Sequence, residues 1–315
     1  MKKIITILFV LFSLYTFSQE KPITDMYNKE EITVNSLLKG SLYTPVKSDK
    51  NTDLVILIAG SGPTNRDGNQ IGMINNSLKF TAQELAKNGI AVFSYDKRII
   101  AQMIAGKVDE RTLTFDDFIN DAREVVTFFK NKKKYHKIII AGHSEGSLIG
   151  MIAADKNTDA FISLAGAGRT IDLIIEDQIE SQAPAFKQET HDNLAMLKNG
   201  KTFELKNQML ASIFRESVQP YMISWIKYNP QEEIKKLNIP VLIINGTKDI
   251  QVGVQEAELL KQAKPDAKLV IVENMNHIFK EIKGDKTENM ASYTNPDLPV
   301  SKVLTDTMIQ FINSL

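Results

Sequence analysis

The sequence predicts an α/β fold: a mostly parallel central sheet with helices on both faces and a helical cap insertion. Short apolar runs alternate with longer amphipathic runs along most of the chain, which is the pattern of such a sheet. The apolar runs are rich in Ile, Val and Leu without polar alternation, as expected for strands covered on both faces. One long interval, residues 169–238, has no strand pattern and predicts the cap.

The elements are expected in the following order along the chain. Residues 31–45 predict an antiparallel pair or edge strands ahead of the parallel strands. The parallel strands are expected at residues 54–59, 90–95, 137–141, 160–164, 240–245 and 268–272. The helices are expected at residues 77–88, 115–133, 144–156, 254–264 and 303–315.

The interval 169–238 is too long for a simple loop between two core strands. Its residues are helix formers with Met, Phe and Trp interspersed. Four helix breakers divide it into about four helices: Pro184, Gly200, Pro220 and Pro230. We therefore expect a core made of residues 19–168 and 239–315, with residues 169–238 as a helical cap over one end of the sheet.

The N-terminal segment MKKIITILFVLFSLYTFSQE has the pattern of a secretory signal peptide. Lys2 and Lys3 precede an apolar stretch, residues 4–12, and residues 16–18 offer small side chains for cleavage before Gln19. The apolar stretch is too short to favour the alternative, a retained membrane anchor. The chain has no cysteine, so it can carry neither a lipid-modified cysteine nor a disulfide. We expect residues 1–18 to be removed and the rest to be exported, to the periplasm or out of the cell.

The charge of the chain argues against nucleic acid as a partner. The formal net charge is zero at pH 7, with 38 basic and 38 acidic residues. The short basic run at residues 132–134 is interpreted as the solvated end of a helix. Without a basic patch, binding to a polyanion is not expected.

The segment IIIAGHSEGSLIG, beginning at residue 138, joins a buried strand to a helix through Gly-x-Ser-x-Gly. This is the pattern of a nucleophile elbow, in which a strained turn presents the serine hydroxyl above the edge of a sheet. Gly142 and Gly146 are needed because the strand and helix backbones pass too close for a side chain. The sequence therefore predicts Ser144 as a nucleophile.

A serine nucleophile needs a general base, and the chain offers four histidines. His136 precedes a strand, at the end away from the elbow. His143 is expected to point away from Ser144 and to have a packing role, and His191 is expected to be exposed in the cap. His277 follows the last parallel strand, at the edge where Ser144 lies, and is therefore the predicted base.

The base needs an acid to orient it, and in this chain order the acid lies between the serine and the histidine. Asp249 is the aspartate of that interval that immediately follows a core strand. The alternatives are that Asp249 only stabilises a turn, or that Glu273 takes the acid's place.

An oxyanion formed during the reaction requires backbone N–H donors. We expect one from Glu145, the residue after the nucleophile, and the other from the loop after the first parallel strand. That loop has three glycines and a proline within residues 60–69. We place the donor at Ser61, with Gly62 as the alternative, and expect Arg66 and Asp67 to pair and hold the loop.

Residues 53–315 resemble the α/β-hydrolase superfamily. More narrowly, they are similar to a bacterial group of exported or cytosolic serine esterases whose oxyanion loop reads Gly-Ser-Gly-Pro-x-x-Arg-Asp-Gly. The matching segments are GSGPTNRDG (60–68), FSYDKR (93–98), GHSEGS (142–147), QPYMISWIKYNP (219–230), GTKDIQV (246–252), NHIFK (276–280) and YTNPDLP (293–299).

The resemblance implies an α/β-hydrolase fold and hydrolysis of carboxylic esters through an acyl-serine intermediate, without metal or cofactor. It implies the roles of Ser144, Asp249 and His277 as nucleophile, acid and base. The chain departs from the group after FSYDKR, where Gly-x-Gly is usual and residues 99–101 read Ile-Ile-Ala. We expect a differently shaped loop near the pocket.

The cap is expected to provide the apolar ceiling of a substrate pocket. Its large side chains at helical spacing are mostly expected in the core between cap and sheet. Met209, Phe214 and Trp225 are the predicted substrate contacts.

The leading functional hypothesis is a serine esterase that acts on a small-molecule ester with a small or medium acyl group. A serine peptidase or aminopeptidase with the same three residues is the second hypothesis. A non-catalytic binding protein on a hydrolase scaffold is the third, and the presence of all three predicted catalytic residues argues against it. No metal, cofactor or stable membrane insertion is expected, and the sequence does not fix the oligomeric state.

Overall fold

A computed structural model of the chain describes residues 26–315, and the predicted signal peptide, residues 1–18, lies outside them. Within the described part, no helix combines the length and the apolar character that crossing a membrane requires.

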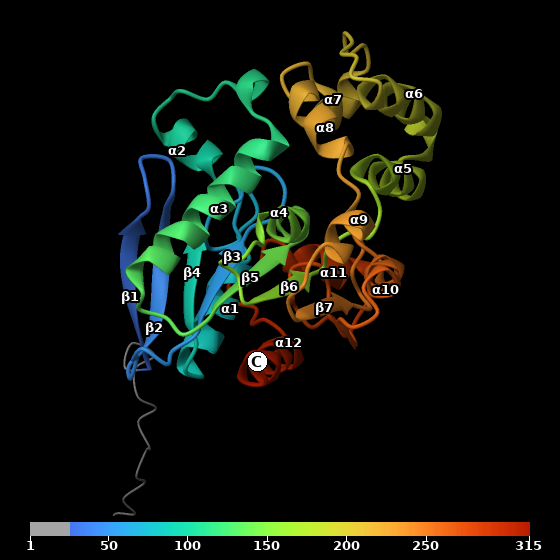
Figure 1. Cartoon of the computed structure of the whole chain (residues 1–315). Helices are drawn as coiled ribbons and strands as arrows, with labels where there is room; N and C mark the ends of the chain where they lie inside the picture. Colours follow the sequence, from blue (N-terminus) through green and yellow to red (C-terminus); the bar gives the residue numbers. More distant parts are fainter. Residues whose placement is uncertain (1–25) are drawn as a thin grey trace, which may run out of the picture.

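An eight-stranded sheet forms the centre of the molecule (Figure 1). Its strand order is β1-β2-β4-β3-β5-β6-β7-β8. The first pair, β1 and β2, is antiparallel, and β2 is also antiparallel to β4, whereas all later pairs are parallel. The strands are β1 (Tyr27–Thr33), β2 (Lys39–Pro45), β3 (Leu54–Ile58), β4 (Ala91–Tyr95), β5 (Ile138–His143), β6 (Ala160–Leu164), β7 (Val241–Gly246) and β8 (Lys268–Val272).

Helices cover both faces of this sheet, because strands β3 to β7 are apolar on both sides. One face packs against α3 (Phe115–Lys132), α4 (Glu145–Ala153) and α10 (Val254–Ala263). The opposite face packs against α1 (Ser77–Lys87) and α12 (Lys302–Asn313). The predicted mostly parallel sheet with helices on both faces is thereby confirmed.

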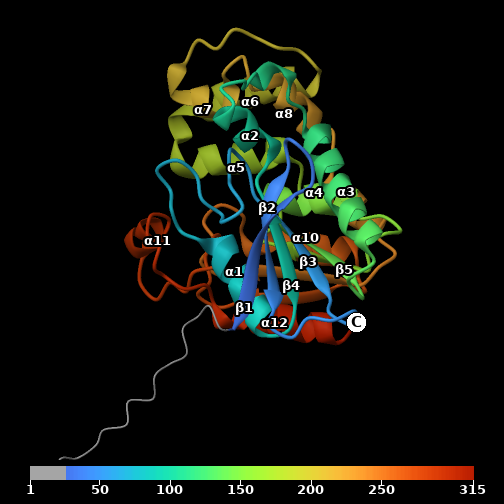
Figure 2. The same cartoon turned by 90° about the vertical axis from the view of Figure 1, so that its left-hand side faces the viewer.

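Between β6 and β7 the chain forms a helical layer that lies above the sheet (Figure 2). It has an apolar cluster of its own, centred on Leu194, Leu210 and Phe214. Its elements are α5 (Ile171–Gln182), the 3-10 helix η3 (Pro184–Phe186), α6 (Lys187–Lys198), η4 (Gln208–Leu210), α7 (Ala211–Phe214), α8 (Gln219–Ile226) and α9 (Pro230–Lys235). We call residues 169–238 the cap.

Ion pairs join the cap to the segment before α3 and to the first turn of α3. Arg215 contacts Glu110 of the 3-10 helix η2 (Glu110–Thr112) at 2.6 Å. Lys227 contacts Asp116 at 2.7 Å. These contacts hold α8 over the region where β5 ends and α4 begins.

Two helices were not predicted from the sequence, α2 (Arg98–Ile104) and α11 (Lys286–Ser292). None of the residues of α2 is buried. A helix without a buried face need not have apolar residues at helical spacing, and this spacing is the pattern from which helices are predicted. Helix α2 contains residues 99–101, where a differently shaped loop was expected.

Candidate active site

Ser144 lies between the end of β5 and the start of α4, with φ 55° and ψ −119°. A non-glycine residue adopts such a conformation only where the surrounding structure enforces it. Here the enforcement comes from close backbone contacts on both sides of the serine. A Cβ on Gly142 would lie 2.1 Å from the carbonyl oxygen of Gly146, and one on Gly146 would lie 2.4 Å from that of Ile58. The predicted need for both glycines follows from these distances.

His277 and Asp249 meet at the same edge of the sheet, on the loops after β8 and β7. The ring Nδ1–H of His277 donates a 2.7 Å hydrogen bond to Oδ2 of Asp249. The other carboxylate oxygen accepts the backbone N–H groups of Gln251 and Val252, each at 2.8 Å. Both side chains are almost completely buried. The aspartate is therefore fixed on two sides, and the alternative acid, Glu273, is exposed.

His143, the residue before Ser144, contacts His277, the predicted base. Its ring Nε2–H donates a 2.9 Å hydrogen bond to the main-chain carbonyl of His277, and the two ring centroids are 4.8 Å apart. Burial, and then the neighbouring His277, lower the pKa of His143 to about 3, so it stays neutral. The other two histidines are exposed and pair with carboxylates elsewhere, His136 with Asp53 and His191 with Glu176.

The Ser144 hydroxyl makes no hydrogen bond to the His277 ring within residues 26–315. The strained turn at Ser144 and the loop of His277 are connected by the hydrogen bond of His143 instead. Active-site hydrogen bonds in ligand-free proteins are often long and shorten only when substrate is bound.

The loop after β3 reaches the elbow because β3 and β5 are neighbours in the sheet, with Ile58 opposite Gly142. The carbonyl oxygen of Ser61 accepts hydrogen bonds from Thr64 Oγ1 at 2.8 Å and from Gln70 Nε2 at 2.9 Å. These bonds shape the loop around Ser61, which lines the same cavity as Ser144.

The predicted pairing of Arg66 with Asp67 is wrong. The Arg66 guanidinium contacts Asp96 at 2.6 Å and also reaches Glu31, so it ties the loop to the strands β4 and β1. Asp67 instead turns its main-chain carbonyl to the first N–H groups of α1, those of Leu78 and Lys79. The charge of Asp96 after β4 is the nearer partner in the fold, although it is 30 residues away in sequence.

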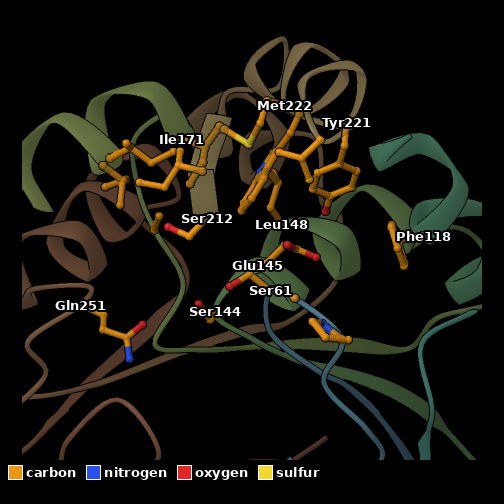
Figure 3. A pocket seen from close by; sticks show the side chains of 18 of the residues that line it. Ser61, Phe118, Ser144, Glu145, Leu148, Ile171, Ser212, Tyr221, Met222 and Gln251 are labelled. Carbon is orange, nitrogen blue, oxygen red and sulfur yellow. The ribbon is translucent and has the colours of Figure 1, made fainter. Parts of the chain in front are cut away.

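A cavity of about 460 Å³ opens above Ser144, between the sheet edge and the cap. Figure 3 shows Ser61, Ser144 and Glu145 at its floor and Met222 and Tyr221 of α8 at its roof. Most of its large apolar side chains come from α4, the cap, α3 and the segment before α3: Leu113, Phe118, Leu148, Ile171, Ile174, Ile175, Ile213, Val218, Met222 and Trp225.

Of the three predicted substrate contacts, only Trp225 lines this cavity. Met209 is 75% exposed on the outer side of the cap, and Phe214 is fully buried in the cap's own apolar cluster. The prediction for these two residues is corrected, because the orientation of each cap helix is set by packing that helical spacing does not reveal. Trp225 stacks on Phe115, with ring centroids 5.3 Å apart.

The sequence did not predict a buried ion pair beside Ser144, between Lys97 after β4 and the side chain of Glu145. Gln70, Tyr221 and Ile99 of α2 were also not predicted, and all three line the cavity. The sequence contained one indication of this ion pair. Lys97 and Glu145 lie in FSYDKR and GHSEGS, two of the segments that carry the resemblance, but the resemblance does not indicate that the two side chains are in contact.

Metal ligation receives no support from side-chain grouping in the part of the chain described here. Among residues 26–315, no three His, Cys, Asp or Glu side chains are placed together so as to hold a metal ion.

A serine in a strained strand-to-helix turn, with a histidine–aspartate pair at the same edge of a mostly parallel sheet, is the arrangement of an α/β hydrolase. Residues 41–263 match the sequence profile of the BD-FAE family. The chain belongs to this family.

The chain is also similar to proteins that are named as esterases. Esterase EstD from Thermotoga maritima is 28% identical over 269 residues, which are 84% of this chain and 63% of that protein. The chain thus spans less than two thirds of the length of this curated relative. Among solved structures, Est1E from Butyrivibrio proteoclasticus has a TM-score of 0.58 at 17% identity and covers 90% of this chain and 99% of its own. The Pyrococcus furiosus esterase Pf2001 has a TM-score of 0.54 at 16% identity and covers 93% of this chain and 92% of its own. At these identities the two structures establish the fold.

Proposed function

We propose that this protein is a carboxylic ester hydrolase, a serine esterase that works through an acyl-serine intermediate. The observation that carries the proposal is the 2.7 Å hydrogen bond between His277 and Asp249 at the sheet edge where Ser144 is held in its strained turn. The family and the similarity to esterase EstD support the same reaction. The GSGPTNRDG loop supports placing the chain in the narrower esterase group with that motif.

In the proposed reaction, Ser144 Oγ attacks the ester carbonyl carbon while His277 Nε2 takes the hydroxyl proton. Asp249 keeps the Nδ1–H tautomer and stabilises the imidazolium. The carbonyl oxygen becomes negative and is bound by the N–H groups of Ser61 and Glu145. The C–O bond to the alcohol then breaks, and the alcohol leaves with the proton from His277.

Water completes the cycle by the same steps. His277 removes a proton from the water as it attacks the acyl carbon, and the tetrahedral oxygen again faces the Ser61 and Glu145 N–H groups. When the bond to Ser144 Oγ breaks, His277 returns the proton to the serine, and a carboxylic acid is released. No other reactant is required.

The cavity favours an ester with a small or medium acyl group. Its lining is more apolar than polar, and its volume of about 460 Å³ lies within the range of pockets for small molecules. Among the described residues, the two acids that line the cavity, Glu110 and Glu145, are paired with Arg215 and Lys97, so neither stands free to bind a substrate amine. A peptidase with the same three residues is the second candidate, and hydrolysis of aminoacyl or prolyl anilides in preference to p-nitrophenyl esters would favour it.

The test is covalent labelling with a fluorophosphonate combined with hydrolysis of p-nitrophenyl butyrate. We expect one adduct on Ser144, and we expect Ser144→Ala to lose labelling and turnover with an unchanged melting temperature. Absence of an adduct in the folded wild type would reject catalysis by this serine and favour a binding protein on a hydrolase scaffold. Ester hydrolysis that persists in Ser144→Ala would reject the assignment of the nucleophile.

Export is a separate proposal, supported by the signal-peptide pattern of residues 1–18. N-terminal sequencing of the protein secreted by a host cell should begin at Gln19. A product that begins at Met1 and stays in the cytosol would contradict it.

A further inference from the structure

A buried ion pair forms part of the cavity floor. Lys97 Nζ is 2.7 Å from Glu145 Oε1, and only 4% of the lysine side chain and 1% of the glutamate side chain are exposed. The lysine also lies over the ring of Phe118, at 4.4 Å from its centroid. The hydrolysis steps above use only the backbone N–H of Glu145, so neither charged group has a role in them.

The ammonium group of Lys97 has a second acceptor, the carbonyl oxygen of Gly60, at 3.1 Å. Gly60 precedes Ser61, the proposed oxyanion donor, and the carbonyl of Gly60 and the N–H of Ser61 belong to one peptide unit. This unit is trans, because the described chain contains no cis peptide bond, so its N–H points away from its carbonyl. Holding the carbonyl on Lys97 therefore directs the Ser61 N–H to the opposite side.

The peptide unit between Gly60 and Ser61 lies beside the elbow. A Cβ on Gly60 would lie only 3.3 Å from the Cβ of Ser144 and 3.4 Å from the His143 ring. The peptide unit is thus packed against the elbow, and a small rotation of it changes the direction of the Ser61 N–H relative to Ser144. The other oxyanion donor is the N–H of Glu145, the residue whose side chain holds Lys97.

We propose that Lys97 is a positioning residue for the oxyanion hole: bound by the Glu145 side chain, it fixes the Gly60–Ser61 peptide so that the N–H groups of Ser61 and Glu145 converge. One ion pair thereby connects the two halves of the hole, which are 84 residues apart in sequence. The proposal rests on the esterase function proposed above.

The cost of the pair supports a role beyond stability. Burying two charges requires desolvation that their attraction often only offsets, and an apolar pair of similar volume is commonly as stable. An apolar side chain of similar length at position 97, such as methionine, would fill the same space. It would, however, leave the Gly60 carbonyl oxygen without this hydrogen-bond donor.

Tyr221 of α8, in the cap, lies next to the Glu145 side chain of the ion pair. Its hydroxyl and the second carboxylate oxygen of Glu145 are both buried, and neither has a hydrogen bond of standard geometry to another described residue. Figure 3 shows that the two groups point toward each other. Burial and then the Glu145 charge raise the pKa of Tyr221 well above its usual value, so the phenol stays protonated. Tyr221 therefore confines the Glu145 carboxylate from above.

The test removes both charges together, so that no lone charge remains buried. Lys97→Met/Glu145→Gln is compared with wild type and with a control, Arg98→Met/Asp121→Asn, which removes a neighbouring, partly buried pair with a 2.7 Å contact between α2 and α3. Melting temperature, kcat and KM for p-nitrophenyl butyrate, and inhibition by phenylboronic acid and by butyrate are measured. Phenylboronic acid forms a tetrahedral adduct on the serine and probes the oxyanion hole, whereas butyrate probes the acyl pocket.

We expect the Lys97→Met/Glu145→Gln variant to lose about 10- to 100-fold in kcat, less than the full loss of an oxyanion donor, which costs about 10²- to 10³-fold. Inhibition by phenylboronic acid should weaken by a similar factor, while KM and butyrate inhibition change less than about 3-fold. The control should lose melting temperature but keep kcat. A purely structural role of Lys97 would weaken both inhibitors alike.

A wild-type kcat and wild-type phenylboronic acid inhibition in the double variant would overturn the inference while leaving the esterase function intact. An inactive, unlabelled wild type would overturn both. If the double variant does not fold, Lys97→Arg gives the measurement, because its guanidinium still pairs with Glu145 but holds the Gly60 carbonyl with different geometry. We then expect a lower kcat at an unchanged melting temperature, and an unchanged kcat would overturn the inference.

Discussion

The ring of His143 donates a hydrogen bond of 2.9 Å to the main-chain carbonyl of His277, and so the residue before the nucleophile holds the loop that carries the proposed base. The sequence predicts a packing role for His143. The structure adds to this role a specific donor function, which the neutral ring performs through its Nε2–H. The low pKa of His143, about 3, keeps it in that state throughout the physiological range.

Replacing His143 by Phe should test this contact. Phe fills a similar volume but leaves the His277 carbonyl without its buried donor, which costs about 1–3 kcal/mol of unfolding free energy. We expect kcat for p-nitrophenyl butyrate to fall by about 10-fold or more because the base is less well placed. Denaturant unfolding and steady-state kinetics measure the two effects. His136→Phe is the control, since His136 is exposed and lies away from the elbow, and equal kinetics in the two variants would contradict the role of His143.

Replacing Asp249 by Asn should separate orientation of the base from folding. The amide retains an oxygen for the N–H groups of Gln251 and Val252, so the loop keeps its hydrogen bonds. Its NH₂ group can face His277 and then favours the wrong tautomer, and we expect kcat to fall by about 10⁴-fold. Asp266→Asn, at an exposed aspartate, serves as the control for kcat and melting temperature. A loss below about 10-fold in the folded variant would mean that Asp249 only stabilises the turn.

Lys280 should make stability depend on pH in the alkaline range. Its side chain is buried, with Nζ 4.8 Å from the Phe80 ring centroid and bonded to the Leu298 carbonyl, and burial lowers its pKa from 10.5 to about 8. Between pH 8 and 10.5 the folded protein has released a proton that the unfolded chain still binds. Unfolding then takes up a proton, so the unfolding free energy rises with pH, by at most about 1.4 kcal/mol per pH unit.

The measurement is denaturant unfolding at several pH values from 7 to 10.5, in wild type and in Lys280→Met. Other groups titrate in both proteins, so the difference between the two curves isolates Lys280. We expect the unfolding free energy of the wild type to increase relative to that of Lys280→Met as the pH rises. Parallel curves would mean that Lys280 has an ordinary pKa in the folded protein.

Replacing Met222 by Trp should change the preference for acyl length. Met222 is on α8 at the roof of the cavity (Figure 3), and a larger side chain there reduces the space above Ser144. We expect the ratio of kcat/KM for p-nitrophenyl octanoate to that for p-nitrophenyl acetate to fall by about 10-fold or more. Met209→Trp, on the exposed side of the cap, should leave the ratio unchanged. An unchanged ratio in Met222→Trp would show that the acyl chain lies elsewhere.

The strands were the most predictable part of the fold. The predicted strands 160–164 and 268–272 coincide with β6 and β8, because a short, mostly apolar run bounded by polar residues leaves few alternatives to a strand. Helix ends were less predictable. The helix predicted at 144–156 spans Glu145–Ala153, since Ser144 is in the strained turn and the chain becomes extended at Ala154.

The sequence by itself determined the sheet, the elbow and the candidate residues Ser144, Asp249 and His277, because each follows a strand and parallel strands end at one edge. Tertiary structure alone decided which charges and cap side chains meet. Arg66 pairs with Asp96 rather than Asp67, Lys97 pairs with Glu145 across 48 residues, and Trp225 rather than Met209 or Phe214 faces the cavity. The physical reason is that strand and turn patterns act between near neighbours in the chain, whereas ion pairs and pocket walls depend on how separate elements pack.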